Sequence, residues 1–145
     1  MNWQKESIND LKAYAARKNS VLTMSEEIAE LEAKAERLNS TLGKVPVQGG
    51  SSKVEDSLIN NIVEKERLKT NLEITKKWIL RVERGLSNLS EEEKQVLDGF
   101  YMANILTNRL EKLCDKLHCE KSTIYRIKEK ALYKFTIAMY GIIDL

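Results

Sequence analysis

The sequence is poor in residues that interrupt helices and in residues that build disulfides. Its 145 residues include one proline, six glycines, two cysteines and one histidine. So few helix breakers predict long helices. Two cysteines are too few for the disulfide framework of a small secreted domain, so we expect a protein of the reducing cytoplasm. The length fits one or two small domains.

Several motifs are also missing. No apolar run approaches the length of a membrane span, and the beginning, MNWQKESINDLKAYAARK, is too charged for a secretory signal. There is no phosphate-binding glycine loop, nucleophile elbow or HExxH pattern. Cys114, His118 and Cys119 have no fourth metal ligand nearby. We therefore expect no membrane segment, no metal, no cofactor and no enzyme activity.

The first half of the chain has a seven-residue apolar repeat. Over residues 8–42, apolar side chains recur every seven residues, with further ones between them: Tyr14, Val21, Met24, Ile28, Leu31, Ala35, Leu38 and Leu42. This alternation of three- and four-residue steps is typical of a coiled-coil helix, which needs a partner helix.

The partner follows a break rich in glycine and serine at 43–52. Residues 53–86 carry a similar repeat with one polar lapse at Lys65, and Ser52 with Glu55 has capping-box spacing. The repeat consists of Leu58, Leu68, Leu72, Ile79, Val82 and Leu86, and it continues beyond this arm to Leu89. We predict an antiparallel helical hairpin over 1–86, with arms 8–42 and 53–86. Pairing of the arms with a second copy stays an alternative, because Ile59, Ile62, Val63 and Trp78 add apolar residues on other faces.

A second domain is predicted over 90–145. Ser90 and Glu93 form a capping box that opens a helix. Two apolar stripes at helical spacing follow, and they are separated by a turn at 118–120. The first stripe is Leu110, Leu113, Cys114 and Leu117; the second is Ile124, Ile127, Ala131 and Phe135. Two short amphipathic helices with a tight turn predict a helix-turn-helix, so the fold class is all-α.

The polar face of the second of these helices suggests a DNA reader. Five basic residues lie between 121 and 134 against one acid, Glu129, although the net charge of the chain is only +2. We expect Lys121, Ser122, Tyr125 and Arg126 to face base edges, and Arg109, Lys112, Lys128 and Lys130 to contact phosphates. The plainer interpretation is a solvated helix over a small core.

The segment STIYRIKEKALYKF, residues 122–135, resembles the end of the promoter-reading helix-turn-helix of sigma factors (region 4). There, an Ile-x-x-Ile stripe precedes a Lys-Ala-Leu run. The chain as a whole resembles the RinA- and ArpU-like late-gene activators of phages and prophages of Gram-positive bacteria. This resemblance implies promoter DNA as a partner, contact with bacterial RNA polymerase, and action in the cytoplasm of the host cell. Nothing resembles the promoter-melting region of a sigma factor.

The function expected from these observations is sequence-specific DNA binding by a transcriptional regulator, as a homodimer. Two alternatives stay open. One is a coiled-coil adaptor or structural protein, in which the hairpin is the functional part. The other is a phage terminase small subunit, because those proteins combine helix-turn-helix and coiled-coil elements and form rings.

Overall fold

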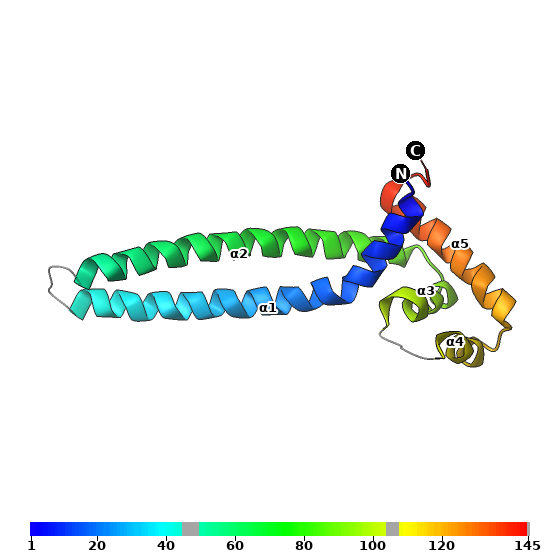
Figure 1. The fold of residues 1–145 in the computed structure, drawn as a ribbon, viewed down its shortest axis with the longest axis horizontal. Helices are drawn as coiled ribbons and strands as arrows, with labels where there is room; N and C mark the ends of the chain where they lie inside the picture. The colour runs from blue at the N-terminus through cyan, green and yellow to red at the C-terminus, as the bar shows by residue number, and fades with distance from the viewer. Residues whose placement is uncertain (45–49, 104–107, 145) are drawn as a thin grey trace. The chain divides into compact units, whose positions relative to one another are not determined.

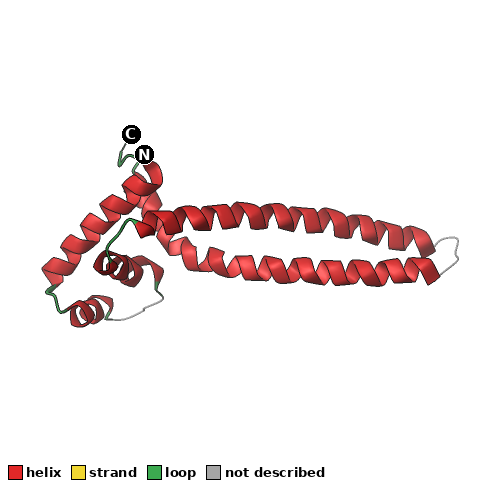
Figure 2. Ribbon diagram, turned by 180° about the vertical axis from the view of Figure 1, so that it is seen from behind, coloured by secondary structure: helices red, strands yellow, loops and turns green. Residues whose placement is uncertain are grey.

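The computed structural model describes residues 1–44, 50–103 and 108–144. Within these ranges the chain is all-α, as predicted, and has no strand beyond an isolated bridge between Asn2 and Asp144 (Figure 2). Its elements are α1 (Trp3–Lys44), α2 (Gly50–Ser87), α3 (Glu91–Leu97), a π-helical turn η1 (Asp98–Met102), α4 (Arg109–Leu117) and α5 (Lys121–Tyr140) (Figure 1).

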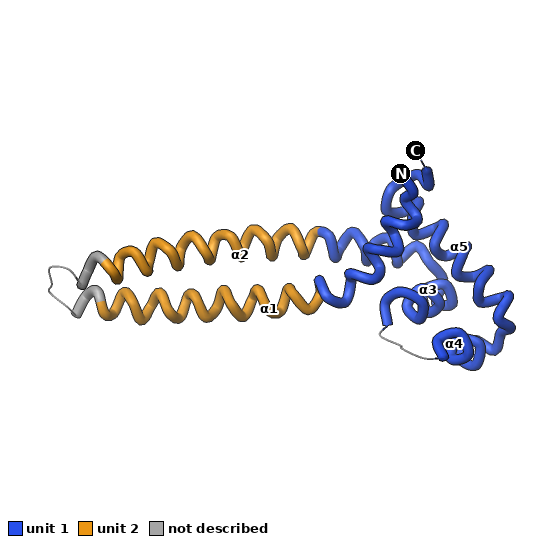
Figure 3. Tube along the Cα trace, in the orientation of Figure 1, with its two compact units in different colours: residues 1–17, 78–145 blue, residues 18–77 orange. Residues whose placement is uncertain are grey.

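The chain divides into two compact units. One is Lys18–Lys77, and the other combines Met1–Arg17 with Trp78–Leu145 (Figure 3). This division differs from the expected boundary at 86–90, because the first turns of α1 and the last turns of α2 belong with the C-terminal helices. Independent folding of 90–145 stays a prediction.

The unit Lys18–Lys77 is the hairpin, in which α1 and α2 lie side by side (Figure 1). Both predicted arms are helical, and both helices are longer than expected. Helix α1 begins at Trp3 rather than at residue 8, and α2 begins at Gly50 rather than at 53. Ser52 therefore lies inside α2 and not at its start; its side chain, like most of the predicted loop, is outside the described residues.

The two arms meet along the predicted heptad residues, which are mostly half-buried. Leu68 is the one apolar side chain below a tenth exposure among the described residues of this unit. Seven residues before it, at the same heptad position, Asn61 is also buried, and its side-chain amide donates a hydrogen bond of 2.8 Å to the carbonyl of Leu31. The main polar interruption of the contact is therefore Asn61 and not the expected Lys65, which stays half-buried.

The other unit has a core shared by the ends of the hairpin helices and by α5. Its buried residues are Leu11, Val82, Leu89, Leu97, Ala131, Leu132, Phe135 and Met139. Helices α2 and α5 approach closely at Gly85, where a Cβ atom would lie 2.8 Å from Cε2 of Phe135. A larger residue at 85 would push the two helices apart.

The C-terminal tail is anchored on the beginning of α1. The Trp3 amide donates to the carbonyl of Ile143 at 2.8 Å, and the Trp3 ring stacks on Tyr140 with 4.7 Å between centroids. The Tyr140 hydroxyl donates to Asp10. Burial, together with this hydrogen bond, raises the pKa of Tyr140 above its usual value. The apolar tail is thus part of the fold.

Candidate nucleic-acid interface

Helix α3 begins with the predicted capping box. The Ser90 hydroxyl accepts from the Glu93 amide at 3.2 Å, and the Glu93 carboxylate accepts from the Ser90 amide at 3.1 Å. The same carboxylate oxygen accepts from Lys134 of α5 at 3.1 Å. Burial alone would raise the pKa of Glu93, but the hydrogen bonds from Ser90 and Lys134 outweigh it and lower that pKa. This cap therefore also ties α3 to α5.

Helices α4 and α5 are joined by the three-residue turn that the sequence predicts. Helix α4 ends at Leu117, and His118 adopts the left-handed conformation with φ of 54°. The Cys119 amide donates to the carbonyl of Cys114 at 3.1 Å, which is the six-to-one bond of a Schellman cap. Helix α5 then begins at Lys121. The local geometry is that of a helix-turn-helix.

The predicted stripes form the core of this motif. Val96, Leu113 and Ile124 are buried, and Cys114 and Ile127 pack against them half-buried. The backbone of η1 meets the side chain of Leu113 at Gly99, where a Cβ atom would lie 2.9 Å from Cδ2 of Leu113. This contact therefore requires a glycine at position 99. The sequence pattern missed it, because the partner of a lone glycine cannot be read from helical periodicity.

The four residues expected to face bases all lie exposed on the first two turns of α5: Lys121, Ser122, Tyr125 and Arg126. They alternate with the buried Ile124 and the half-buried Ile127, so they share the solvent side of the helix. The N-cap residue Glu120 makes no side-chain hydrogen bond to the helix start. The first amides of α5 therefore lack a side-chain cap, which is the condition under which a helix start can bind a phosphate.

The four residues expected to contact phosphates divide into two pairs. Lys112 on α4 and Lys130 on α5 are exposed. Arg109 is half-buried and donates to the carbonyl of Phe100 at 2.7 Å. The side chain of Lys128 is only 19% exposed, and its ammonium lies 5.2 Å from the ring centroids of both Phe100 and Tyr125. Arg109 and Lys128 therefore support the surface from within.

Phe100 is the residue of this surface that sequence reasoning did not assign to it. It belongs to η1, and its ring lies 6.0 Å from that of Tyr125, tilted by 50°. Aromatic pairs at this distance and tilt attract each other. The exposed Tyr125 is thus supported by a ring from a different element. An apolar residue at helical spacing after Val96 and Leu97 was the available signal, and it indicated only a core position.

Some charges on this part of the chain are already engaged. Lys121 lies 3.9 Å from Glu111, and both side chains are more than half exposed, so the pair is weak. Lys134 is bound to Glu93. The exposed cations of α4 and α5 are Lys112, Lys116, Lys121, Arg126 and Lys130. The motif is therefore less basic at its surface than the run 121–134 suggests.

Other kinds of site receive little support. Cys114 and Cys119 are free thiols, and across the described ranges no three His, Cys, Asp or Glu side chains gather in a way that could hold a metal ion. None of the helices in those ranges has the length and hydrophobicity needed to cross a membrane.

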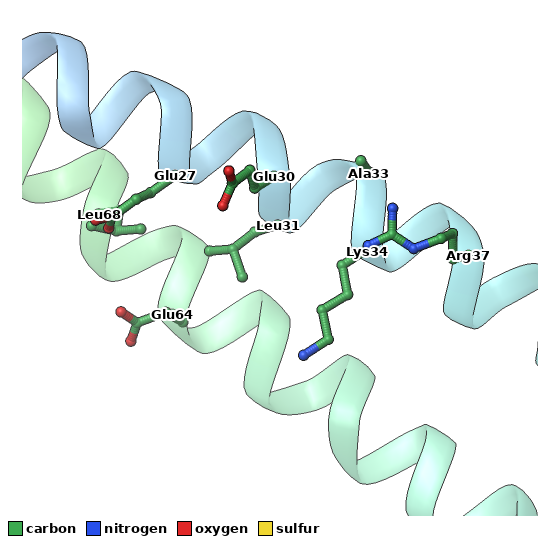
Figure 4. A pocket seen from close by; sticks show the side chains of 8 residues that line it. All are labelled: Glu27, Glu30, Leu31, Ala33, Lys34, Arg37, Glu64 and Leu68. Carbon is green, nitrogen blue, oxygen red and sulfur yellow. The ribbon is translucent and has the colours of Figure 1, made fainter.

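The hairpin unit carries an open hollow of about 550 Å³ where α1 lies beside α2 (Figure 4). Leu31 and Leu68 are among its lining residues, and the charged side chains that line it carry both signs: Glu27, Glu30, Lys34, Arg37 and Glu64. Glu64 is engaged by Arg67. This mixed, open lining lacks the convergent polar groups of a small-molecule site.

Fold and surface together define an all-α protein in which a long helical hairpin is combined with a helix-turn-helix. The chain belongs to the family described as "Protein of unknown function (DUF1492)", whose model matches residues 38–136. That match runs from the last turns of α1 to the buried part of α5, so it includes the whole helix-turn-helix. No curated protein and no solved structure matches the chain.

Proposed function

We propose that the chain is a sequence-specific DNA-binding transcriptional regulator that inserts the start of α5 into the major groove. The observation that carries the proposal is the joint exposure of Lys121, Ser122, Tyr125 and Arg126 on one side of a helix start. These side chains offer hydrogen-bond donors and an aromatic edge, the groups that read base edges. The same helix is fixed from behind by Ile124 and Phe135, which are fully buried.

Phosphate contacts are assigned to the exposed lysines that flank this helix start. Lys112 lies on α4, before the turn, and Lys130 lies on α5, after the residues proposed to read bases. Each helix of the motif therefore contributes one of these lysines. Backbone amides at the uncapped start of α5 add a further phosphate contact. Arg109 and Lys128 are not proposed as primary phosphate contacts, because their charged groups face Phe100.

The finer role proposed is that of a phage late-gene activator that acts with the host RNA polymerase in the bacterial cytoplasm. Its support is the resemblance of STIYRIKEKALYKF to sigma region 4 and of the chain to the RinA- and ArpU-like regulators. A single helix-turn-helix makes few base contacts, so affinity must come from dimerisation or from docking on polymerase. The exposed apolar residues of α2 that are available for association include Ile59, Ile62, Val63 and Ile74, and we favour a homodimer.

Selection from a random DNA library with the purified full chain tests the proposal. The expected result is enrichment of one sequence motif, with an affinity that falls steeply as salt increases. Arg126→Ala should relax the enrichment at one position, whereas Glu92→Ala, an exposed change on α3, should leave the motif intact. Recovery of no motif would refute sequence-specific binding.

The second candidate is a coiled-coil adaptor, which the exposed apolar residues on the outer side of α2 favour. It predicts association without any DNA preference. The remaining alternative is a terminase small subunit, and the mass in solution distinguishes it from a regulator. A terminase small subunit would form a ring, whereas a regulator would be a monomer or a dimer. The DNA selection and a light-scattering measurement together distinguish the three functions.

A further inference from the structure

Tyr125 is supported on two sides although almost half of it faces solvent. Its side chain is 46% exposed, yet the Phe100 ring lies 6.0 Å from it and the Lys128 ammonium lies 5.2 Å from its centroid. Lys128 is three residues further along α5, so it lies on the neighbouring turn of the same side. The three groups form a cluster in which one cation faces two rings.

The support comes from a part of the fold that is itself fixed. The carbonyl of Phe100 accepts a 2.7 Å hydrogen bond from Arg109, the first residue of α4. Its neighbour Gly99 is packed against Leu113, and the π-turn closes with a 2.7 Å bond from the Ala103 amide to Asp98. These contacts fix the backbone of Phe100, whose ring is half-buried against the core of the motif, so Tyr125 packs against a supported ring.

We propose that Tyr125 reads a thymine in the major groove, and that Phe100 and Lys128 are positioning residues that orient its ring. This inference rests on the proposed function and specifies its base readout. Thymine is the base that presents an apolar methyl group next to a hydrogen-bond acceptor, O4, on its major-groove edge. A tyrosine edge carries the matching pair, ring carbons and a hydroxyl group. Because the ring is already packed against Phe100 and Lys128, less side-chain entropy is lost when it binds.

Lys128 could orient Tyr125 or bind a phosphate, and the surroundings of its ammonium favour the orienting role. Its side chain is 19% exposed and its ammonium faces two rings, whereas Lys130, two residues further along α5, is exposed. A phosphate contact would change the affinity for every DNA sequence by a similar factor. An orienting role would instead change the preference for one base, and this difference can be measured.

The experiment uses the full chain and the motif obtained by DNA selection. Each thymine in the motif is replaced in turn by deoxyuridine, which removes only the methyl group. We expect one position at which this replacement weakens binding about fourfold, the effect of one buried methyl group. Tyr125→Ala should bind the thymine and uracil versions equally. If no position discriminates against uracil, or if Tyr125→Ala keeps the discrimination, the thymine assignment is wrong.

The positioning role is tested on the same pair of DNA molecules. Phe100→Leu and Lys128→Met should each reduce the ratio of thymine to uracil affinity, while their affinity for unrelated DNA stays within about twofold of the original. Tyr133→Leu, an exposed aromatic change two turns after Tyr125, is the control and should keep the ratio. Circular dichroism establishes whether each variant is folded. Two positioning variants are used so that the test still works if one of them does not fold.

The possible outcomes separate the inference from the function on which it rests. An unchanged ratio in both positioning variants would overturn the role of Phe100 and Lys128 while DNA reading stands. A uniform loss on all sequences in Lys128→Met would make Lys128 a phosphate contact. If selection recovers no motif, the proposed function itself fails.

Discussion

Lys134 of α5 lies 3.1 Å from the carboxylate of Glu93, whose side chain is only 8% exposed. One acid thereby serves two purposes: it closes the cap of α3 at Ser90 and it binds the helix that carries the proposed reading surface. The run of basic residues 121–134 thus contains one lysine that serves folding. The sequence alone does not show that this lysine has a structural role.

Glu93→Gln should lower the free energy of unfolding by about 1–2 kcal/mol, because it removes a charge-assisted contact to a partly exposed lysine. The folded-state pKa of Glu93 lies below the unfolded value, so its contribution is present above about pH 4.3. It is lost as the pH falls through the folded-state pKa. Urea unfolding at several pH values should show the gap between wild type and variant closing in acid. Glu92→Gln, at an exposed neighbouring position, is the control and should change little at any pH.

Arg126→Ala should weaken binding to the selected motif by about 1–3 kcal/mol and relax the preference at one position, because Arg126 is exposed on the reading side of α5. Lys112→Ala should instead weaken binding to all sequences and reduce the slope of log affinity against log salt by about one. Titrations at three salt concentrations distinguish these effects. A uniform loss in Arg126→Ala would place that side chain on a phosphate.

Ile124→Ala should destabilise the chain by about 2–5 kcal/mol, because Ile124 is fully buried between α3, α4 and α5. The matched control is Ile137→Ala, because Ile137 is exposed on the same helix. Thermal unfolding followed by circular dichroism compares them. Equal small losses would mean that the helix-turn-helix core is not formed in solution as described.

Gly99→Ala should cost about 1–3 kcal/mol, since the new methyl group would meet the buried side chain of Leu113 at 2.9 Å. The double variant with Leu113→Val should recover part of the loss, because the shorter side chain leaves room for the methyl group. A double-mutant cycle in urea measures this coupling. Additive losses in the cycle would show that the two residues do not meet.

Much of the fold could be predicted from the sequence, because helical periodicity shows which side of a helix is apolar. The stripes around Leu113 and Ile124 and the cap at Ser90 are examples. Periodicity does not show which element covers a stripe. For that reason the core that Leu11 and Val82 form with α5, and the divided unit that results, could not be derived from the apolar stripes.

The reading surface was predicted in part for a similar reason. The exposure of Lys121 and Arg126 follows from their angular position on α5 relative to Ile124, and residue spacing in the sequence is enough to give that position. The inward placement of Lys128 depends on Phe100, a residue 28 positions earlier, and that contact exists only in three dimensions. Asn61 is comparable: it is too short to reach water from the hairpin contact, whereas the longer Lys65 can extend its ammonium to solvent.

The hairpin carries exposed aliphatic residues through which two copies can associate. Ile59, Ile62 and Val63 are each more than half exposed and lie close together on the outer side of α2, whereas exposed apolar side chains without a function are usually scattered singly. If these residues form an interface between two copies, replacing all three by glutamine should convert a dimer of 16.7 kDa chains into a monomer. It should also weaken specific DNA binding, because two helix-turn-helix motifs would no longer bind one site together.

Light scattering on the intact chain and on the triple variant is the direct measurement. Leu22→Gln, a similarly exposed change on α1, is the control and should leave the mass of the dimer unchanged. Circular dichroism should show equal helicity in all three proteins, because glutamine is a good helix former. A wild-type chain that is strictly monomeric and still binds its motif tightly without polymerase would exclude both dimerisation and polymerase docking as the source of affinity. The helix-turn-helix of a single copy would then have to make all the contacts, and the apolar side of α2 would need a different partner.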